Sequence, residues 1–157
     1  MTVSVWRIAT ETPAYAANDL SGAGARITGG RWNNKRTPVV YCASNIALAV
    51  LETVQAMRRG GLPFNRYLVR VDIPTDVWDA RTRLDAPPPG WDAVPAGLAS
   101  RRAGERWIAA GTSALLQVPC VIVPDEFNIL INPRHPEVVT LSATTLKRWI
   151  FDPRFFP

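Results

Sequence analysis

One acidic residue, Glu52, stands alone in a strongly apolar segment of the chain. From Asn45 to Met57 nine residues are apolar, and Glu52 is the only charged one. The pattern predicts a helix whose apolar positions extend nearly all round its axis, so that the helix is largely buried. A carboxylate in such surroundings is costly unless it finds a partner or shifts its pKa. Glu52 is therefore either half of a structural ion pair with an arginine or a functional carboxylate that lines a cleft.

A second candidate lies upstream, in the segment Gly29-Gly30-Arg31-Trp32-Asn33. The two glycines let the backbone approach a ligand closely. Arg31 beside Trp32 offers a guanidinium fork for phosphate next to a flat aromatic face. The alternative is a turn with an exposed arginine. Since the segment is neither GxGxxG nor a P-loop, a dinucleotide-binding Rossmann domain is not supported.

Tyr41 and His135 complete the residues that could do chemistry. Tyr41 lies near the end of a predicted strand, eleven residues before Glu52, so both side chains could reach one cleft, although a core tyrosine fits the same position. His135 is the only histidine, and the prolines around it indicate a turn residue rather than a base. A single histidine excludes a two-histidine ribonuclease mechanism, and no GxSxG elbow indicates a Ser-His-Asp hydrolase.

The hydrophobic pattern predicts the elements that must position these residues. A helix capped by Ser44 should run to about Arg58 and end at Gly60-Gly61, and a second should run from Pro95 to Ala110 and end at Gly111. Thr12–Gly30 and the proline-rich Asp85–Asp92 should be loops. Strands are expected over Val3–Ile8, Thr37–Ala43, Arg66–Ile73, Val118–Val123, Asn128–Ile131, Val138–Leu141 and Arg148–Phe151. Strands with two inserted helices predict an α+β (mixed α/β) fold rather than a doubly wound one.

Length and composition predict one globular domain spanning residues 1–157. Of the 157 residues 47% are apolar and 20% are charged. No apolar stretch approaches the roughly 18 residues that span a bilayer, and the N-terminus lacks a signal-peptide pattern. We therefore expect a soluble, cytoplasmic protein without a membrane segment. Cys42 and Cys120 lie in apolar runs and are expected to be buried, reduced thiols, and with one histidine they cannot build a zinc site of the usual kind.

The net charge of +5 is carried almost entirely by arginine, since Lys35 and Lys147 are the only lysines. Arginine suits bidentate binding of phosphate or carboxylate. The positive net charge is compatible with nucleic acid, a phosphorylated small ligand or an acidic protein as partner, and it does not distinguish among them. Four places where arginine and tryptophan are adjacent could stack bases, which keeps a nucleic-acid-binding module or ribonuclease toxin as an alternative. These pairs are Trp6-Arg7, Arg31-Trp32, Arg106-Trp107 and Arg148-Trp149.

These residues, in this order, resemble the RES domain family, and the resemblance spans nearly the whole chain. The matching pieces are Trp6-Arg7-Ile8, Gly29–Asn33, Pro38–Tyr41, Ala47–Glu52, Gly104–Trp107, Val118–Pro124, Asn128–Pro136 and Phe151–Arg154. The resemblance implies a fold like that of ADP-ribosyltransferases, with central β-sheets and a few flanking helices. It also implies the toxin of a type II toxin–antitoxin pair that destroys NAD+ or transfers its ADP-ribose. The implied partner is an Xre-type helix-turn-helix antitoxin, and a homodimer within a larger complex is compatible with it.

The resemblance also implies roles for individual residues. Arg31 would hold the NAD+ diphosphate, with Arg7 as a second phosphate ligand, and Tyr41 would stack on the nicotinamide side. Glu52 would act at the nicotinamide ribose, and Trp32 would add a face to the binding site. The family serine has two candidates, because Cys120 stands where Val-Pro-Ser is expected and Ser113 lies seven residues earlier.

The chemistry explains why so few groups would suffice. Nicotinamide leaves NAD+ as a neutral molecule, so no general acid has to protonate it, whereas an ordinary glycosidase expels an oxygen and usually needs two carboxylates. One carboxylate can stabilise the oxocarbenium-like ribose and orient the acceptor. No metal is required. Water or phosphate as acceptor would deplete NAD+, and the alternative is a protein acceptor, which would make the chain an ADP-ribosyltransferase.

Overall fold

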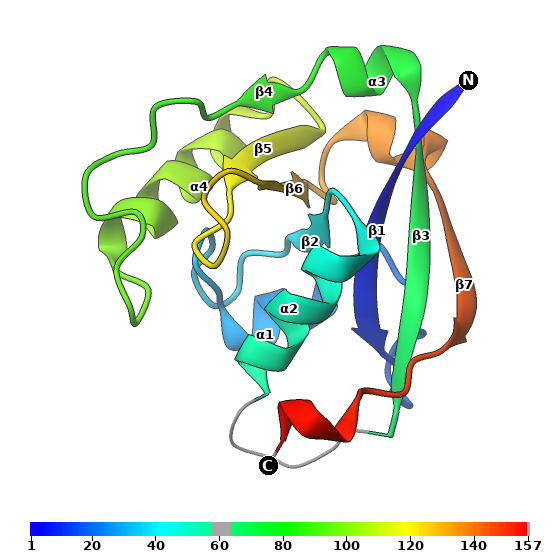
Figure 1. The fold of residues 1–157 in the computed structure, drawn as a ribbon. Helices are drawn as coiled ribbons and strands as arrows, with labels where there is room; N and C mark the ends of the chain where they lie inside the picture. Colours follow the sequence, from blue (N-terminus) through cyan, green and yellow to red (C-terminus); the bar gives the residue numbers. More distant parts are fainter. Residues whose placement is uncertain (58–63, 157) are drawn as a thin grey trace.

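The computed structural model describes residues 1–57 and 64–156, and its seven strands form one mixed sheet (Figure 1). The strand order is β4-β5-β6-β2-β1-β3-β7, and every neighbouring pair is antiparallel except β4 and β5. The expected α+β class is confirmed. The strands are β1 (Thr2–Thr10), β2 (Val40–Ala43), β3 (Arg66–Pro74), β4 (Thr82–Arg83), β5 (Leu115–Pro119), β6 (Phe127–Ile131) and β7 (Ser142–Arg148).

The sheet is nearly divided between β1 and β2. These strands are joined through a single residue pair, Trp6 with Ala43, whereas β1 and β3 pair continuously from Thr2–Pro74 to Thr10–Arg66. In Figure 1 the strands β1, β3 and β7 run side by side on one side of the molecule, and β2, β5 and β6 lie turned away from them. Because the ladder does not continue past Trp6, the remainder of β1 separates from β2 and leaves space between the two halves.

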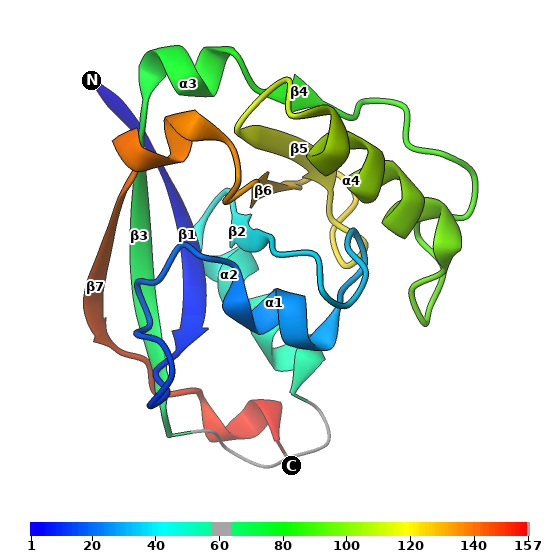
Figure 2. The same ribbon diagram turned by 180° about the vertical axis from the view of Figure 1, so that it is seen from behind.

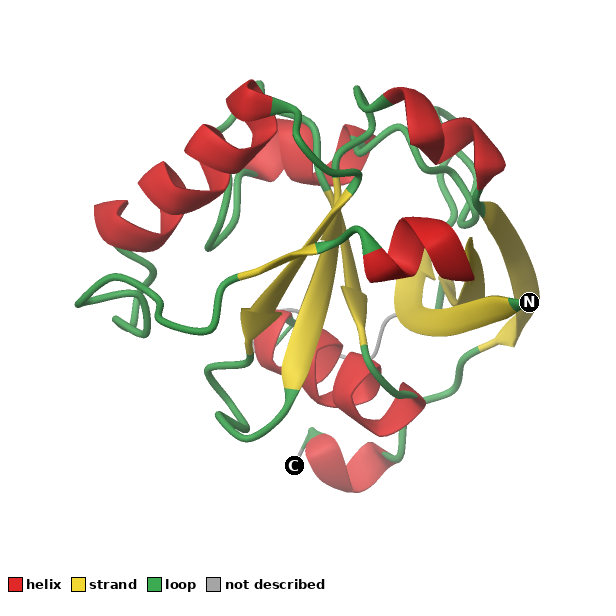
Figure 3. Cartoon of the chain, turned by 90° about the horizontal axis from the view of Figure 1, so that it is seen from above, coloured by secondary structure: helices red, strands yellow, loops and turns green. Residues whose placement is uncertain are grey.

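Helices cover both faces of the sheet (Figure 3). Helix α2 lies in front of the strands in Figure 1, and α1 lies in front in the reverse view of Figure 2. These two helices therefore lie on opposite faces, on either side of the place where β1 and β2 separate. The helices are α1 (Ala23–Thr28), α2 (Ile46–Ala56), α3 (Thr75–Asp79), α4 (Leu98–Ala110) and the 3-10 helices η1 (Pro136–Thr140) and η2 (Pro153–Phe155).

The buried apolar side chains form three clusters that follow this architecture. One lies on the strands themselves and includes Val5, Val71 and Ile73, and a second packs beneath α2 around Leu48 and Ala49. The third packs beneath α4 and is built on Trp32, Trp107, Ile108, Leu116, Val118 and Leu130. The segment that carries Trp32 is thus anchored by its own aromatic side chain.

Several expected elements are confirmed, with small changes in their bounds. Strands β1 and β3 lie where they were predicted, and α4 ends at Gly111 in the left-handed conformation that suits glycine (φ 61°). Helix α4 begins at Leu98 rather than Pro95, and β2 and β5 are displaced or shorter than expected. The predicted continuation of α2 to Arg58 and its stop at Gly60-Gly61 lie outside the described residues.

Other expectations are wrong for local reasons. Asn45, not Ser44, caps α2, because its side-chain oxygen accepts the amide of Leu48 at 2.8 Å. The expected strand over 138–141 is replaced by η1, which starts at a proline and is capped by the His135 side chain. The expected strand over 148–151 is replaced by the last residue of β7 and irregular chain, and helix α1 lies inside the expected loop over 12–30.

Helix α2 is much less buried than its apolar sequence suggests. Only Leu48 and Ala49 are buried, and the side of α2 that carries Leu51 is open to solvent. Only one side of the helix packs on the sheet, so a large part of its surface can line a cavity. Within the described ranges no helix has the length and apolar character needed to cross a bilayer.

Candidate active site

A cavity of about 560 Å³ opens where β1 and β2 separate. Its walls come from both halves of the sheet: the last residues of β1, helix α1 and the segment after it, β2, and helix α2. A volume of this size is typical of a small-molecule site. Arg7, Arg31, Trp32, Tyr41 and Glu52, all proposed from the sequence, are among the lining residues.

Glu52 is held by two hydrogen-bond donors rather than by an arginine. Its Oε1 accepts the Cys120 thiol at 3.0 Å and the Asn128 amide Nδ2 at 2.6 Å. No ion pair among the described residues involves Glu52. Hydrogen bonds to a charged acceptor are among the stronger ones in proteins and fix the orientation of the carboxylate. Both contacts use the same oxygen, and no described residue donates a hydrogen bond to Oε2.

Cys120 is a structural donor rather than a thiolate. Its side chain is completely buried, and burial together with the hydrogen bond to Glu52 raises the pKa of the thiol to about 11. The thiol is therefore protonated near neutral pH and can donate its proton to the carboxylate. Both cysteines are free and buried, as expected.

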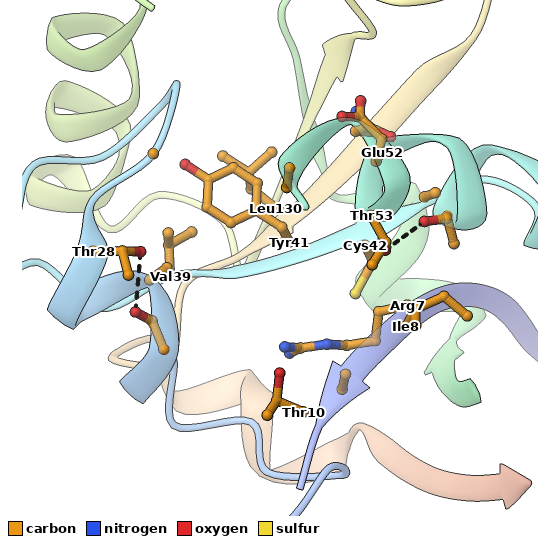
Figure 4. Close-up of a pocket in the computed structure, with 18 of the residues that line it drawn as sticks. Arg7, Ile8, Thr10, Thr28, Val39, Tyr41, Cys42, Glu52, Thr53 and Leu130 are labelled. Carbon is orange, nitrogen blue, oxygen red and sulfur yellow. Dashed lines mark hydrogen bonds between the residues drawn. The ribbon is translucent and has the colours of Figure 1, made fainter. Parts of the chain in front are cut away.

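Arg7 extends from β1 into the cavity, and no described residue forms an ion pair with its guanidinium. Its Nε is buried and has no hydrogen-bond partner among the described residues. In Figure 4 the guanidinium points toward the side of Thr28, while Glu52 lies across the view on α2 with its carboxylate turned away from Arg7. Arg7 as a whole is half-buried, and a guanidinium whose buried Nε has no partner is unfavourable by itself, so this position suits an anionic group of a ligand.

Arg31 also lines the cavity, but part of its guanidinium is already engaged. Its Nη1 donates to the backbone carbonyls of Trp91 and Ala93, each at 2.8 Å. These bonds tie the segment after α1 to the loop before α4 and hold the guanidinium in one place. Arg31 keeps its other nitrogen atoms for a ligand, since these two contacts use only Nη1.

Tyr41 presents its ring rather than its hydroxyl to the cavity. The hydroxyl donates to Asn33 Oδ1 at 2.7 Å and accepts the Trp32 amide at 3.0 Å, and burial raises its pKa far above the ordinary value. Gly30 makes room for it, because a Cβ at that position would lie 2.7 Å from the Tyr41 hydroxyl oxygen. Asn33, fully buried, completes the network by donating to the carbonyl groups of Ala25, Asn34 and Thr37.

Trp32 and Ser113 lie mainly in the interior. Trp32 is 3% exposed and stacks on Trp91 at a centroid distance of 6.2 Å. Ser113 is not among the residues that line the cavity; its hydroxyl lies 2.7 Å from the Thr82 hydroxyl and accepts the Trp107 indole N–H. Of the two candidates for the family serine, the structure therefore brings Cys120, and not Ser113, to Glu52.

His135 lies in the turn that was expected for it. Its Nδ1 accepts the backbone amide of Glu137 and caps η1, and it does not line the cavity. Among the residues that the structure describes, no group of three histidine, cysteine or acidic side chains could hold a metal ion.

Sequence reasoning missed two residues of this site. Asn128 lies at the start of an apolar strand, opposite Ala43 in β2, where its amide reaches Glu52. A polar residue that opens an otherwise apolar run was the available signal. Arg66 also lines the cavity, with Nε 3.4 Å from the Met57 sulfur. No sequence signal distinguishes it from the other arginines.

The fold is that of a known toxin–antitoxin component. It matches a chain of the M. tuberculosis MbcT–MbcA toxin–antitoxin complex with a TM-score of 0.62 and 17% identity, over 94% of this chain and 85% of that chain. At 17% identity, this match shows a likeness of fold alone.

Sequence comparison defines the family. The model of the RES domain matches residues 4–152, so the chain belongs to the RES domain family and the resemblance is confirmed. A relative from Sphingobium sp. (strain YBL2), named "Prs ADP-ribosylating toxin", is 52% identical over 98% of this chain and 97% of its own. A Yersinia enterocolitica relative named "Toxin Res" is 35% identical over 89% of this chain and 92% of its own.

Proposed function

We propose that this chain is the toxin of a toxin–antitoxin pair and that it cleaves the bond between nicotinamide and ribose in NAD+. The observation that carries the proposal is the single carboxylate of Glu52, oriented by two donors at the wall of a cavity that also holds Arg7, whose buried Nε has no partner among the described residues. The name of the relative at 52% identity supports NAD+ as the substrate, because ADP-ribosylation uses it.

The proposed reaction needs few groups. The C–N bond breaks with its electron pair going to nicotinamide, which leaves as a neutral molecule, and positive charge develops on the ribose. The Glu52 carboxylate stabilises this charge and orients the acceptor, which bonds to the ribose carbon and loses a proton. Arg7 and Arg31 hold the diphosphate, since guanidinium groups bind phosphate oxygens through paired hydrogen bonds.

We assign the remaining sequence-derived candidates as follows. Tyr41 contributes the face of its ring to the nicotinamide side, because its hydroxyl is engaged elsewhere. Cys120 takes the role of the family serine, as the donor to Glu52. Trp32 lines the cavity with only a small part of its surface, since it is 3% exposed, and Ser113, which does not line the cavity, supports the site from the interior.

The acceptor defines two versions of the function. Water or phosphate would make the chain an NAD+ glycohydrolase or phosphorylase that depletes NAD+. A protein acceptor would make it an ADP-ribosyltransferase, and the name of the Sphingobium relative favours this version. In either version we propose a cytoplasmic location and neutralisation by an Xre-type antitoxin that covers the cavity. The fold match to one component of a toxin–antitoxin complex supports such a partner.

The first test is the release of free nicotinamide from NAD+ by the purified protein, compared with Glu52→Gln. We expect the variant to lose at least about a hundredfold in rate, because glutamine cannot stabilise the developing positive charge. Thermal unfolding of both proteins checks that the fold is intact. A Glu52→Gln rate equal to that of the parent would contradict the proposal.

The same reaction distinguishes the acceptors when it contains labelled NAD+. Free ADP-ribose indicates water, a phosphorylated ADP-ribose that depends on added phosphate indicates phosphate, and label on a protein band of a lysate indicates protein transfer. Release of nicotinamide must equal the sum of these products.

A further inference from the structure

Three arginines from separate segments meet at a small concave site outside the cavity. Arg26 lies on α1, Arg36 in the segment that leads to β2, and Arg134 in the turn after β6. Together with Ser21, Ala23 and Pro38 they line a pocket of about 320 Å³. Of its residues only Ala23 also lines the large cavity, so the two sites lie on different sides of α1.

In the described part of the chain, none of the three guanidinium groups is in an ion pair. All three residues are exposed, and no described residue accepts a hydrogen bond from their guanidinium groups. The acidic residue nearest in sequence to this pocket, Asp19, accepts hydrogen bonds from Ser21, which lines the pocket, and forms no ion pair with the three arginines. Three like charges at one site repel each other, and an anion would relieve this repulsion.

The backbone that carries the cluster is closely packed. Gly22, at φ +74°, brings the segments together, because a Cβ there would lie 2.6 Å from the Val39 amide nitrogen and 3.0 Å from Pro133 Cγ. The Arg36 amide donates to the Arg26 carbonyl at 2.7 Å, and the Arg134 amide donates to the Asn132 side chain at 3.1 Å. The convergence of the arginines is therefore built into the fold.

Arg36 adds a second, independent observation. It is a non-glycine residue with positive φ (78°), a conformation that costs free energy for a side chain of this size. A strained backbone at a surface arginine points to a role for the position that its side chain takes, and here that position completes the cluster.

We propose that Arg26, Arg36 and Arg134 form a binding site for a phosphoryl group, separate from the proposed NAD+ cavity. A pocket of this size with three guanidinium groups suits a phosphate or diphosphate, whose several oxygens can each accept paired hydrogen bonds from arginine. The phosphoryl group belongs either to a small phosphorylated ligand or to the backbone of a nucleic acid.

The test is calorimetric titration of the complete chain with inorganic pyrophosphate at constant ionic strength. Arg26→Gln and Arg134→Gln are each expected to weaken binding about tenfold, the effect of losing one charge-assisted hydrogen bond. Arg102→Gln is the matched control, because it removes one exposed arginine from α4 without touching the cluster. Pyrophosphate can also bind in the large cavity, where Arg7 is proposed to hold the NAD+ diphosphate. The titration is therefore repeated in the Arg7→Gln protein, in which Arg26→Gln and Arg134→Gln should still weaken the remaining binding, whereas Arg102→Gln should bind as the parent does.

A second titration uses a single-stranded oligothymidylate. Binding of the oligonucleotide that is tighter than that of pyrophosphate, steeply salt-dependent and weakened by the same two variants assigns the phosphoryl group to nucleic acid. Binding of pyrophosphate alone assigns it to a small ligand. The proposal is overturned if pyrophosphate does not bind, if Arg102→Gln weakens it equally, or if only Arg7→Gln does. None of these results depends on NAD+ turnover.

Discussion

At the scale of single residues, the decisive feature is how Glu52 is oriented. The sequence singled out this carboxylate as a candidate, either as half of an ion pair with an arginine or as a functional group lining a cleft, and the structure places it at the cavity wall without an ion pair among the described residues. The structure supplies neutral donors, Cys120 and Asn128, instead. A neutral donor fixes the carboxylate without cancelling its charge, so the negative charge remains available to a positive transition state.

This arrangement predicts different effects for two substitutions at Cys120. Cys120→Ala removes one donor to the carboxylate and should lower the rate of nicotinamide release about tenfold, whereas Cys120→Ser keeps a donor and should stay within about threefold of the parent. Steady-state rates of the two variants at saturating NAD+ are the measurement. A merely structural role for the thiol would give no rescue by serine.

Asn128→Ala provides the independent check from β6. Its amide donates to the same oxygen of Glu52, so its loss should resemble Cys120→Ala in size. Parental rates in both alanine variants would show that the two donors do not position Glu52.

At the scale of elements, the segment from Gly29 to Asn33 is held by packing rather than by regular structure. Helix α4 approaches it so closely that a Cβ at Gly104 would lie 1.8 Å from the Trp32 carbonyl oxygen. Gly30 similarly leaves room for the Tyr41 hydroxyl. Close packing at Gly30 and Gly104 thus helps to fix the positions of Arg31 and Tyr41 at the cavity.

Gly104→Ala should therefore destabilise the protein by about 3 kcal/mol or more, because the clash is with backbone and requires α4 to move. In an ordinary helix interior the same change would stabilise by up to about 1 kcal/mol. Urea unfolding followed by circular dichroism measures the difference. Gly97→Ala, at the start of the same helix with its nearest neighbour 3.8 Å away, is the control and should change stability by less than about 1 kcal/mol. A stabilised Gly104→Ala protein would contradict the packing.

At the scale of the whole molecule, the cavity exists because the sheet is held together by one residue pair between β1 and β2. Arg7 belongs to the half that contains β1, and Glu52 follows β2 in the other half. A ligand that contacts both residues connects the two halves, so its binding should stabilise the entire fold.

NAD+ should accordingly raise the melting temperature of Glu52→Gln, the variant in which turnover is removed. At a hundred times the Kd the gain is about 2.7 kcal/mol, which corresponds to roughly 5–10 °C for a chain of this size. Adding Arg7→Gln should reduce the shift at the same NAD+ concentration. Differential scanning fluorimetry is the measurement, and an equal shift in the doubly substituted protein would argue against a role for Arg7 in binding.

The sequence alone predicted the α+β class, the central strands β1 and β3, the candidate carboxylate and the family. These predictions depend on local pattern and residue type, such as the alternation in Arg66–Ile73 or a lone glutamate among apolar residues. Such patterns can be read without knowledge of the fold. Predictions from the sequence were wrong where residues distant in the chain determine the structure. Helix α2 is half open to solvent rather than largely buried, because only one of its sides packs on the sheet. Residues 136–140 form the 3-10 helix η1 rather than the predicted strand.

Only the tertiary structure could decide which side chains meet. Cys120 and Asn128 lie 68 and 76 residues from Glu52 in the chain, and Ser113, close to Cys120 in sequence, is directed into the interior instead. Strand pairing through Ala43 and Asn128, and the close approach of backbones at Gly22, Gly30 and Gly104, set these positions. Packing and register are long-range properties, because each depends on the shape of the partner surface as well as on the residue itself.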